Sequence, residues 1–172
     1  MALKQKNPKK IEDLLQVSRE TINSLIFYEN ILCKYNKNMN LIAKSTENQI
    51  KIRHIIDSAQ VIDFIDKKIK ICADLGTGAG FPGIVLAIIM KEWKHVPRFD
   101  LYEKSPKKCQ FLLKVVKKLN LNVKILEKNV IEQKNLYADT VVARAFKPVP
   151  AVFEIVTKKI RSLVFNIFTY SS

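Results

Sequence analysis

Hydrophobic positions follow two different periods along the chain, and the change falls near residue 68. Before it, apolar residues recur at spacings of three and four, which is the pattern of one buried helix face: Ile22, Leu25, Tyr28, Leu32 and Tyr35. Ser18 is placed to cap the start of this helix, and residues 36–40 are placed to end it. The spacing therefore predicts a long amphipathic helix from about residue 18 to residue 36.

A capping box, Thr46-Glu47-Asn48-Gln49, predicts a second helix that begins at Thr46. The spacing of its apolar residues predicts an inward face made of four side chains: Ile52, Ile55, Ile56 and Ala59. Two helices alone bury little surface, so we expect residues 1–68 to form a helical extension that packs on a larger unit.

From residue 69 onward, short apolar segments alternate with helical ones, which is typical of a parallel sheet covered on both faces. We expect strands at 69–75, 99–102, 123–126, 140–143 and 162–170. We expect helices at 82–91, 105–119 and 149–159. The sequence predicts an α/β fold, a doubly wound and mostly parallel sheet over 69–172, within a single domain that spans 1–172.

The composition suits one domain that binds polyanions. The chain has 172 residues, 48% of them apolar, and a formal net charge of +14. Such a field attracts nucleic acid. A different explanation stays open, because 25 of the 30 cations are lysine, and AT-rich coding would also enrich lysine, isoleucine and asparagine.

Cysteine spacing and hydropathy indicate a cytoplasmic protein. Cys33, Cys72 and Cys109 are far apart and form no CxxC pair, so we expect neither disulfides nor a metal site. The longest apolar run, 83–90, is too short to cross a bilayer, and no apolar segment follows the basic N-terminus. We expect no membrane partner.

All four glycines lie in one segment between a predicted strand and a predicted helix: Asp74-Leu75-Gly76-Thr77-Gly78-Ala79-Gly80-Phe81-Pro82-Gly83. A tight turn would explain one of them; the cluster indicates a loop that a ligand approaches closely. A dinucleotide fingerprint would need glycine at Phe81, and no GK[ST] follows for a P-loop. The pattern favours S-adenosylmethionine, with Gly76 and Gly78 beside the cofactor and Asp74 organising the loop near its methionine end.

Two later segments fit the same cofactor. Glu103 ends the second predicted strand, where a carboxylate can accept hydrogen bonds from both ribose hydroxyls. An ordinary surface glutamate is the alternative explanation. Val130 and Ile131 follow the third strand, where apolar side chains would flank an adenine ring.

An ordered set of four motifs resembles a known family. The motifs are Arg53-His54-Ile55-Ile56-Asp57-Ser58, the glycine loop, Glu103 with Lys107-Lys108-Cys109-Gln110-Phe111-Leu112, and Ala143-Arg144-Ala145-Phe146. Together they are similar to the bacterial ribosomal RNA small subunit methyltransferase G family, also called glucose-inhibited division protein B. The resemblance runs from about residue 20 to residue 157.

The resemblance implies a Rossmann-like class I methyltransferase that uses S-adenosylmethionine to methylate N7 of a guanine in the 530 loop of 16S rRNA. The partner would be 16S rRNA or the 30S subunit. Five residues of this chain correspond to the family's cofactor contacts: Gly76, Phe81, Val130, Ile131 and Arg144. Glu103 corresponds to the carboxylate that binds the ribose. One departure is that Asn129-Val130-Ile131 replaces a motif ending in Glu, so a carboxylate near the adenine is missing unless Glu132 substitutes for it.

The implied chemistry needs no acid–base residue, because N7 of guanine carries a free lone pair. We therefore assign no catalytic acid or base, and we expect His54 and Arg144 to position the substrate. The structural alternatives are a packing role for His54 and an ion pair for Arg144. Helical spacing also lets Asp57 meet His54 or Arg53.

Three further expectations concern the charges, the chain end and the activity. Five lysines of the helix at 105–119 fit a solvated face better than an RNA contact: Lys107, Lys108, Lys114, Lys117 and Lys118. For the lysines of the N-terminal tail, both explanations stay open. The final residues depart from the family's ending. We explain this departure by a truncation or frameshift that removes the later strands of the sheet, and we expect the remaining chain to bind the cofactor. A non-catalytic RNA-binding remnant and, more remotely, a dehydrogenase are the alternative functions. We expect a monomer.

Overall fold

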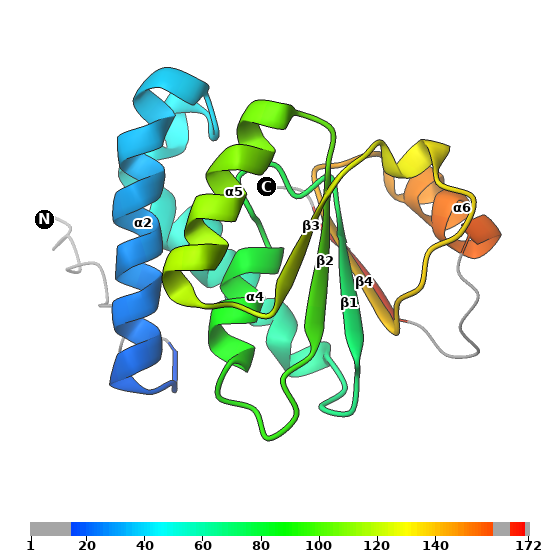
Figure 1. Cartoon of the computed structure of the whole chain (residues 1–172), viewed down its shortest axis with the longest axis horizontal. Helices are drawn as coiled ribbons and strands as arrows, with labels where there is room; N and C mark the ends of the chain where they lie inside the picture. The colour runs from blue at the N-terminus through cyan, green and yellow to red at the C-terminus, as the bar shows by residue number, and fades with distance from the viewer. Residues whose placement is uncertain (1–14, 160–165, 171–172) are drawn as a thin grey trace, which may run out of the picture.

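The computed structural model describes residues 15–159 and 166–170, the last five by their backbone alone. Five parallel strands form one sheet in the order β3-β2-β1-β4-β5, and Figure 1 shows α2, α4 and α5 on one face and α6 on the other. The described strands are β1 (Ile71–Leu75), β2 (Arg98–Glu103), β3 (Val123–Glu127), β4 (Thr140–Arg144) and β5 (Asn166–Tyr170). The described helices are α2 (Arg19–Met39), η1 (Lys44–Gln49), η2 (Lys51–Ile56), α3 (Asp57–Ala59), η3 (Gln60–Phe64), α4 (Gly83–Met90), α5 (Pro106–Leu119), η4 (Val130–Glu132) and α6 (Val149–Lys159).

The long first helix is confirmed, with both of its predicted ends. The Ser18 hydroxyl oxygen accepts a hydrogen bond from the Thr21 N–H at 3.2 Å, which satisfies one of the free donors of the first turn. Asn40 ends the helix in the left-handed conformation, with φ of 47°. The predicted apolar face is buried, with Leu25, Tyr28 and Leu32 fully enclosed.

The prediction of the second helix is wrong about where the helix begins and about which residues face inward. Residues 44–49 form a 3₁₀ helix whose N-cap side chain makes no hydrogen bond, and residues 51–56 form a π-helix. The Thr46 hydroxyl donates to the Ala43 carbonyl at 2.9 Å instead of capping a helix. Because π turns bond five residues back, apolar residues at three and four no longer share one face. Ile55 and Ala59 are buried, but Ile52 is 54% exposed.

The sheet prediction is confirmed, strand for strand, in the part of the chain that is described. The strand predicted from residue 69 begins at Ile71, because a turn in which the Ile69 N–H donates to the Asp66 carbonyl comes first. The strand predicted at 162–170 is β5, which pairs in parallel with β4; residues 160–165 and 171–172 lie outside the described part. The predicted truncation concerns the end of the chain and is not addressed by the fold.

The helical extension shares its core with the sheet. One apolar cluster joins Leu25 and Tyr28 of α2 to Phe81, to α4 and to Leu112 of α5. All eight residues of α4 are buried, since α2 covers its outer side and β2 its inner side. A second cluster fills the opposite face, between the sheet and α6. The extension is therefore built into the hydrophobic layer that holds the glycine loop.

The strand order reverses between β1 and β4, which lie side by side in the middle of the sheet. In doubly wound sheets the loops on the two sides of such a point diverge, and ligands bind at the carboxyl ends of the strands there. The glycine loop follows β1 at this edge. The topology thus places the loop where a cofactor crevice is expected.

Candidate functional site

A cavity of about 360 Å³ lies at the carboxyl edge of the sheet, at the reversal point. Residues at and beyond the carboxyl ends of four strands line it: Gly76 and Gly78 after β1, Tyr102 and Glu103 at the end of β2 with Lys104 and Lys108 beyond it, Lys128, Asn129, Val130 and Ile131 after β3, and Ala145, Phe146 and Lys147 after β4. Five of the predicted cofactor residues thus meet at one site: Gly76, Gly78, Glu103, Val130 and Ile131. A larger hollow of about 630 Å³, beside Leu15 and Trp93, brings none of the predicted site residues together.

The four glycines have different surroundings. This corrects the interpretation that the absence of a side chain serves a bound ligand at all four positions. An added Cβ at Gly78 would meet nothing closer than 3.9 Å, so this glycine opens onto the cavity. At Gly80 it would lie 2.5 Å from Ile84 Cγ1, and at Gly83 it would lie 2.3 Å from Leu101 Cδ2. Gly80 and Gly83 are therefore required by close packing.

Asp74 ties the two ends of the loop together. It is fully buried, and its Oδ2 accepts hydrogen bonds from the Thr77 hydroxyl at 2.6 Å and from the Gly83 N–H at 2.9 Å. Burial raises the pKa of Asp74 to about 7, although the two hydrogen bonds and the charge of Arg144 lower it. The organising role expected from the sequence is present, and an approach to the methionine end of a cofactor stays a prediction.

Glu103 connects the loops after β1 and β2. One carboxylate oxygen accepts a hydrogen bond from the Gly78 N–H at 3.0 Å, and the other accepts from the Ser105 N–H at 2.8 Å. The side chain is 7% exposed and lines the cavity, so it is not an ordinary surface glutamate. Each carboxylate oxygen has a second lone pair, which leaves Glu103 able to accept hydroxyl donors from a ligand.

Sequence reasoning gave no role to several side chains that line the cavity. Phe146 leans over Gly76, where an added Cβ would lie 2.3 Å from its Cδ2 atom, and Ala145 before it has φ of 48°. Four lysines form a cationic rim: Lys104, Lys108, Lys128 and Lys147. Lys108 thus differs from the solvated helix face to which it was assigned. The signal available in the sequence was position, since each follows the carboxyl end of a strand closely.

Phe81 and Arg144 lie together, but neither is part of the cavity lining. The Arg144 guanidinium carbon is 4.6 Å from the centroid of the Phe81 ring, and His54 stacks on the same ring at 5.0 Å. Arg144 Nη1 is 3.9 Å from Asp57 Oδ2 and donates to the Arg53 carbonyl at 3.3 Å. The ion-pair alternative for Arg144 therefore describes its observed contacts, which fasten β4 to the helical extension.

His54 is a buried, neutral side chain at neutral pH. Its Nε2 lies 3.0 Å from the Thr46 hydroxyl oxygen, and its Nδ1 has no hydrogen-bond partner among the described residues. Burial, followed by the charges of Arg144 and Arg53, lowers the pKa of His54 to about 4. Asp57 pairs with Arg144, and Arg53 donates instead to the Gln49 side chain at 2.7 Å. Asp57 therefore does not make the contacts with His54 or Arg53 that helical spacing allows, because the π-helix changes the register.

Glu132 does not replace the carboxylate that the family motif would place near the adenine. Its Oε1 accepts a hydrogen bond from the Asn129 Nδ2 at 2.8 Å, and Glu132 is not part of the cavity lining. Asn129 also caps η4, since its Oδ1 accepts from the Ile131 N–H at 3.1 Å. The side of the cavity after β3 is therefore formed by Val130 and Ile131 beside the Asn129 amide.

Other site classes find no support in the described part of the chain. The three cysteines are free, and no group of three or more His, Cys, Asp or Glu residues there could hold a metal. Within the same residues, none of the helices combines the length and the apolar character that a membrane crossing needs.

The chain is similar to a family of known proteins over most of its length. Residues 21–167 match the model of the GidB family, described as rRNA small subunit methyltransferase G. A curated relative from Pelagibacter ubique, with that same name, is 40% identical over 148 residues, which cover 85% of this chain and 70% of the relative. Another from Jannaschia sp. is 39% identical, and the match covers 76% of this chain and 62% of the relative.

A solved structure supports the fold. An O-methyltransferase of Brevibacillus brevis, solved in complex with S-adenosyl-L-homocysteine, superposes with a TM-score of 0.54 at 11% identity and covers 82% of this chain and 48% of its own. At that identity the likeness concerns the fold alone, and it confirms the Rossmann-like methyltransferase architecture. Because the family match spans both the helical extension and the sheet, this chain belongs to the GidB family, the rRNA small subunit methyltransferase G family.

Proposed function

We propose that this chain transfers the methyl group of S-adenosylmethionine to N7 of a guanine in 16S ribosomal RNA, in the cytoplasm. The observation that carries the proposal is the cavity at the strand reversal, which joins the glycine loop, Glu103 and the Val130–Ile131 pair. Family membership supports it, since relatives along most of the chain carry the name of a ribosomal RNA methyltransferase. The specific target atom comes from the family resemblance.

The residues present fit the cofactor. The missing side chain at Gly78 leaves backbone open to the cavity, where the amino-acid end would lie. Glu103 would accept the ribose hydroxyls on the lone pairs that Gly78 and Ser105 leave free. Val130 and Ile131 would flank the adenine. When bound, S-adenosylmethionine supplies an electrophilic methyl group on a sulfonium ion.

The main contribution of the protein to this reaction is to align the guanine N7 with the methyl group. N7 of a guanine base is unprotonated at neutral pH and attacks with its own lone pair, so no residue has to remove a proton. Holding two reactants in line is worth on the order of 7–11 kcal/mol in well-oriented systems. His54 is uncharged at neutral pH and fixed on Phe81, which suits it to hold the shape of the loop.

The lysine rim gives the RNA an approach to this cavity. Lys104, Lys108, Lys128 and Lys147 line the cavity from the segments that follow β2, β3 and β4. Cations around an opening raise the local concentration of a polyanion and orient its phosphates. We also propose that the helical extension and the sheet form one domain, because a single apolar cluster joins them, and that this domain acts as a monomer.

The test is methyl transfer from labelled S-adenosylmethionine to 16S rRNA and to 30S particles, followed by mapping of N7-methylguanosine. We expect label at one guanine, and strong loss of label for Glu103→Gln. The matched control is Glu132→Gln, whose carboxylate lies outside the cavity lining and pairs with Asn129. A folded chain that binds 16S rRNA and S-adenosylmethionine yet leaves both substrates unlabelled would contradict the proposal.

A further inference from the structure

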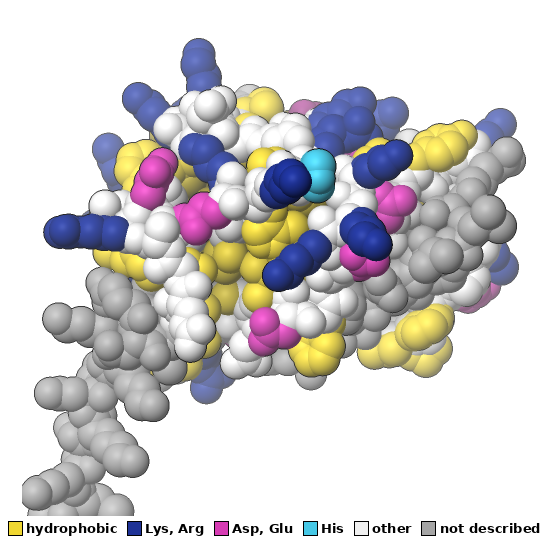
Figure 2. Space-filling model, turned by 90° about the horizontal axis from the view of Figure 1, so that it is seen from below, with side chains coloured by type: hydrophobic (Ala, Val, Ile, Leu, Met, Phe, Trp, Pro, Cys, Tyr) yellow, Lys and Arg dark blue, Asp and Glu magenta, His cyan; other side chains and the backbone are white. Residues whose placement is uncertain are grey.

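The opposite edge of the sheet, where the strands begin, carries a second cationic surface. Figure 2 looks at the molecule from below the view of Figure 1 and shows Lys and Arg side chains gathered around a histidine. The loops before β1 and β2, with the first residue of β2, contribute its described basic residues, which we call the amino-edge patch: Lys67, Lys68, Lys70, Lys94, His95 and Arg98. Five of these six side chains are exposed, and Arg98 is half-buried.

The amino-edge patch surrounds a hollow. A cavity of about 450 Å³ is lined by Lys68, Ile69, Lys70, His95, Val96, Arg98 and Asn122. The lining combines positive charge with an imidazole and an amide, all of which can donate hydrogen bonds to an anion. None of these residues belongs to the cavity at the carboxyl edge.

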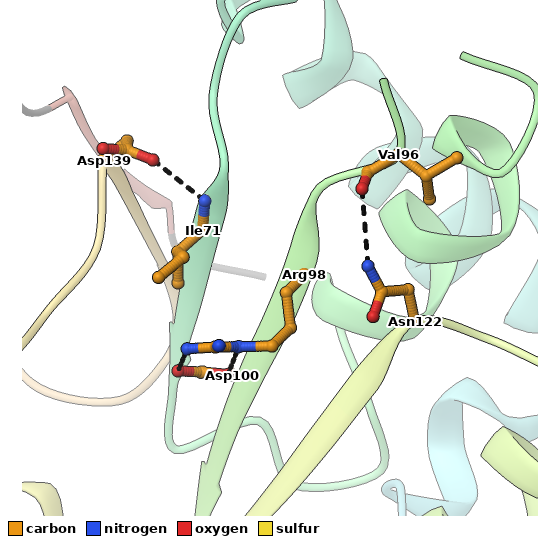
Figure 3. Close-up of polar contacts among 6 residues, drawn as sticks. All are labelled: Ile71, Val96, Arg98, Asp100, Asn122 and Asp139. Atoms are coloured by element: carbon orange, nitrogen blue, oxygen red, sulfur yellow. Dashed lines mark hydrogen bonds and ion pairs between the residues drawn. The ribbon is translucent and has the colours of Figure 1, made fainter. Parts of the chain in front are cut away.

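The carboxylates nearby are already engaged with the backbone or with Arg98. Asp139 Oδ2 accepts from the N–H groups of Lys70 at 2.8 Å and of Ile71 at 2.9 Å, and Asp66 accepts from the Lys68 N–H at 2.8 Å. Figure 3 shows Asp139 bound to Ile71 and Asp100 bound to Arg98. In the described residues no carboxylate forms an ion pair with Lys68 or Lys70.

Asp100 fixes the orientation of the Arg98 guanidinium and leaves some of its donors free. Asp100 accepts two parallel hydrogen bonds from this guanidinium, at 2.7 Å from Nε and 2.9 Å from Nη2, which fix the plane of the group. A guanidinium has five N–H donors, so three of them stay available. Asn122 is positioned in the same way, because its amide nitrogen donates to the Val96 carbonyl at 3.4 Å (Figure 3).

We infer that the amino-edge patch binds phosphates of the RNA backbone, as a second contact remote from the methyl-transfer cavity. The inference rests on the proposed RNA substrate. An anionic membrane fits less well, because Val96 is the exposed apolar side chain of the lining and surface-bound proteins insert an apolar face. A protein partner fits less well, because charged residues are depleted at the centres of protein interfaces and aromatic ones enriched.

The geometry defines what such an RNA must do. The two cavities lie at opposite ends of β1, which has five residues. At about 3.3 Å per residue the two edges are separated by roughly 16 Å. RNA that occupies both must reach along the side of the molecule from one edge to the other. A single nucleotide placed in the methyl-transfer cavity would not touch the amino-edge patch.

The test compares two double variants of the full chain, Lys68→Gln/Lys70→Gln and a control, Lys34→Gln/Lys117→Gln, which removes the same charge from exposed positions of α2 and α5. Affinity for a 16S rRNA fragment is measured against salt concentration. Each phosphate contact contributes about 0.7 to the slope of log affinity against log salt for single strands. For the first variant only, we expect the slope to fall by about 1.4, which corresponds to a loss of affinity of about 25-fold at 0.1 M salt relative to 1 M salt. Its KM for RNA rises while kcat and cofactor affinity stay unchanged.

Equal slopes in both variants would mean diffuse attraction by the net charge and would overturn the inference. So would a first variant that loses binding to phosphatidylserine vesicles while its binding to RNA stays intact. Labelling of 16S rRNA in the same samples separates the two proposals. Labelling with unchanged slopes contradicts the amino-edge patch alone. RNA binding that depends on Lys68 and Lys70 without any labelling contradicts the proposed activity alone.

Discussion

The two halves of the glycine loop look alike in sequence and differ in what surrounds them. On the cavity side, the nearest atom to an added Cβ at Gly78 is 3.9 Å away. On the packed side, an added Cβ would lie 2.5 Å from Ile84 at Gly80 and 2.3 Å from Leu101 at Gly83. The packed side also holds the rings of Tyr28, Phe81 and His54, with Tyr28 donating to the Ala79 carbonyl at 2.8 Å.

This difference shows that one motif combines two physical tasks. Glycine on the cavity side leaves backbone uncovered at Gly78, and on the packed side it lets a helix and a strand approach each other. Variants of the two sides should therefore separate stability from ligand binding. Single substitutions on each side of the loop, and between the two sides, test that separation.

The largest effect is expected at the packed side, from Gly83→Ala. Alanine favours a helix by about 1 kcal/mol over glycine, so helix propensity alone predicts a gain in stability. The overlap with Leu101 Cδ2 and Asp74 Oδ2 instead predicts a loss of roughly 3 kcal/mol. Urea unfolding measures the difference, and a variant as stable as the wild type would show that Gly83 is not confined by packing.

On the cavity side, Glu103→Gln should weaken cofactor binding. A hydrogen bond to a charged group is worth about 1.5–3 kcal/mol, which corresponds to roughly a ten- to hundredfold loss of affinity. Calorimetry with S-adenosylmethionine measures this loss. Glu132→Gln serves as the control and should change affinity less than about twofold, because that side chain bonds Asn129 outside the cavity lining. Equal losses in the two variants would remove Glu103 from the site.

Between the two sides, Asp74 should make stability depend on pH. Its pKa of about 7 lies above the ordinary value of 3.8, so the folded state binds the proton more tightly than the unfolded state. The contribution of Asp74 to stability is therefore complete below about pH 4 and decreases as the pH rises to about 7. From pH 5.5 to 7, this decrease is on the order of 2 kcal/mol.

Asp74→Asn mimics the protonated carboxyl group and removes this titration. The stability of the variant relative to the wild type should therefore rise between pH 5.5 and 7 and then level off. Urea unfolding of both proteins at several pH values gives that difference, in which the other titrating groups cancel. A difference that does not vary with pH would mean that Asp74 is ionised throughout.

The smallest effect, about 1 kcal/mol of stability, is expected from Arg144→Met. The change removes the contact with the Phe81 ring and the pair with Asp57, whose side chain is 35% exposed and therefore partly screened. If Arg144 belongs to the packed side, thermal unfolding shifts and cofactor affinity stays within about threefold. Lost cofactor affinity at unchanged stability would instead assign Arg144 to the cavity side.

Most of the sheet and the helices that cover it could be predicted from the amino-acid sequence. Short apolar runs gave β1, β2, β3 and β4 to within two residues, and the alternating helical segments gave α4, α5 and α6 equally well, because burial requires those patterns. The sequence also determined the main cavity residues. Gly76, Glu103 and Val130 each follow the carboxyl end of a predicted strand, and parallel strands bring those ends to one edge.

The tertiary structure alone decided which neighbours each residue has. The π-helix at Lys51–Ile56 rotated Ile52 outward and turned Asp57 to Arg144, a pairing between residues 87 positions apart that no local spacing encodes. The packing of Gly80 and Gly83, and the gathering of Lys68, Lys70 and Arg98 at the amino edge, likewise depend on segments from different parts of the chain. Periodicity reports which face of an element is buried, whereas the partner on that face is set by the chain's long-range path.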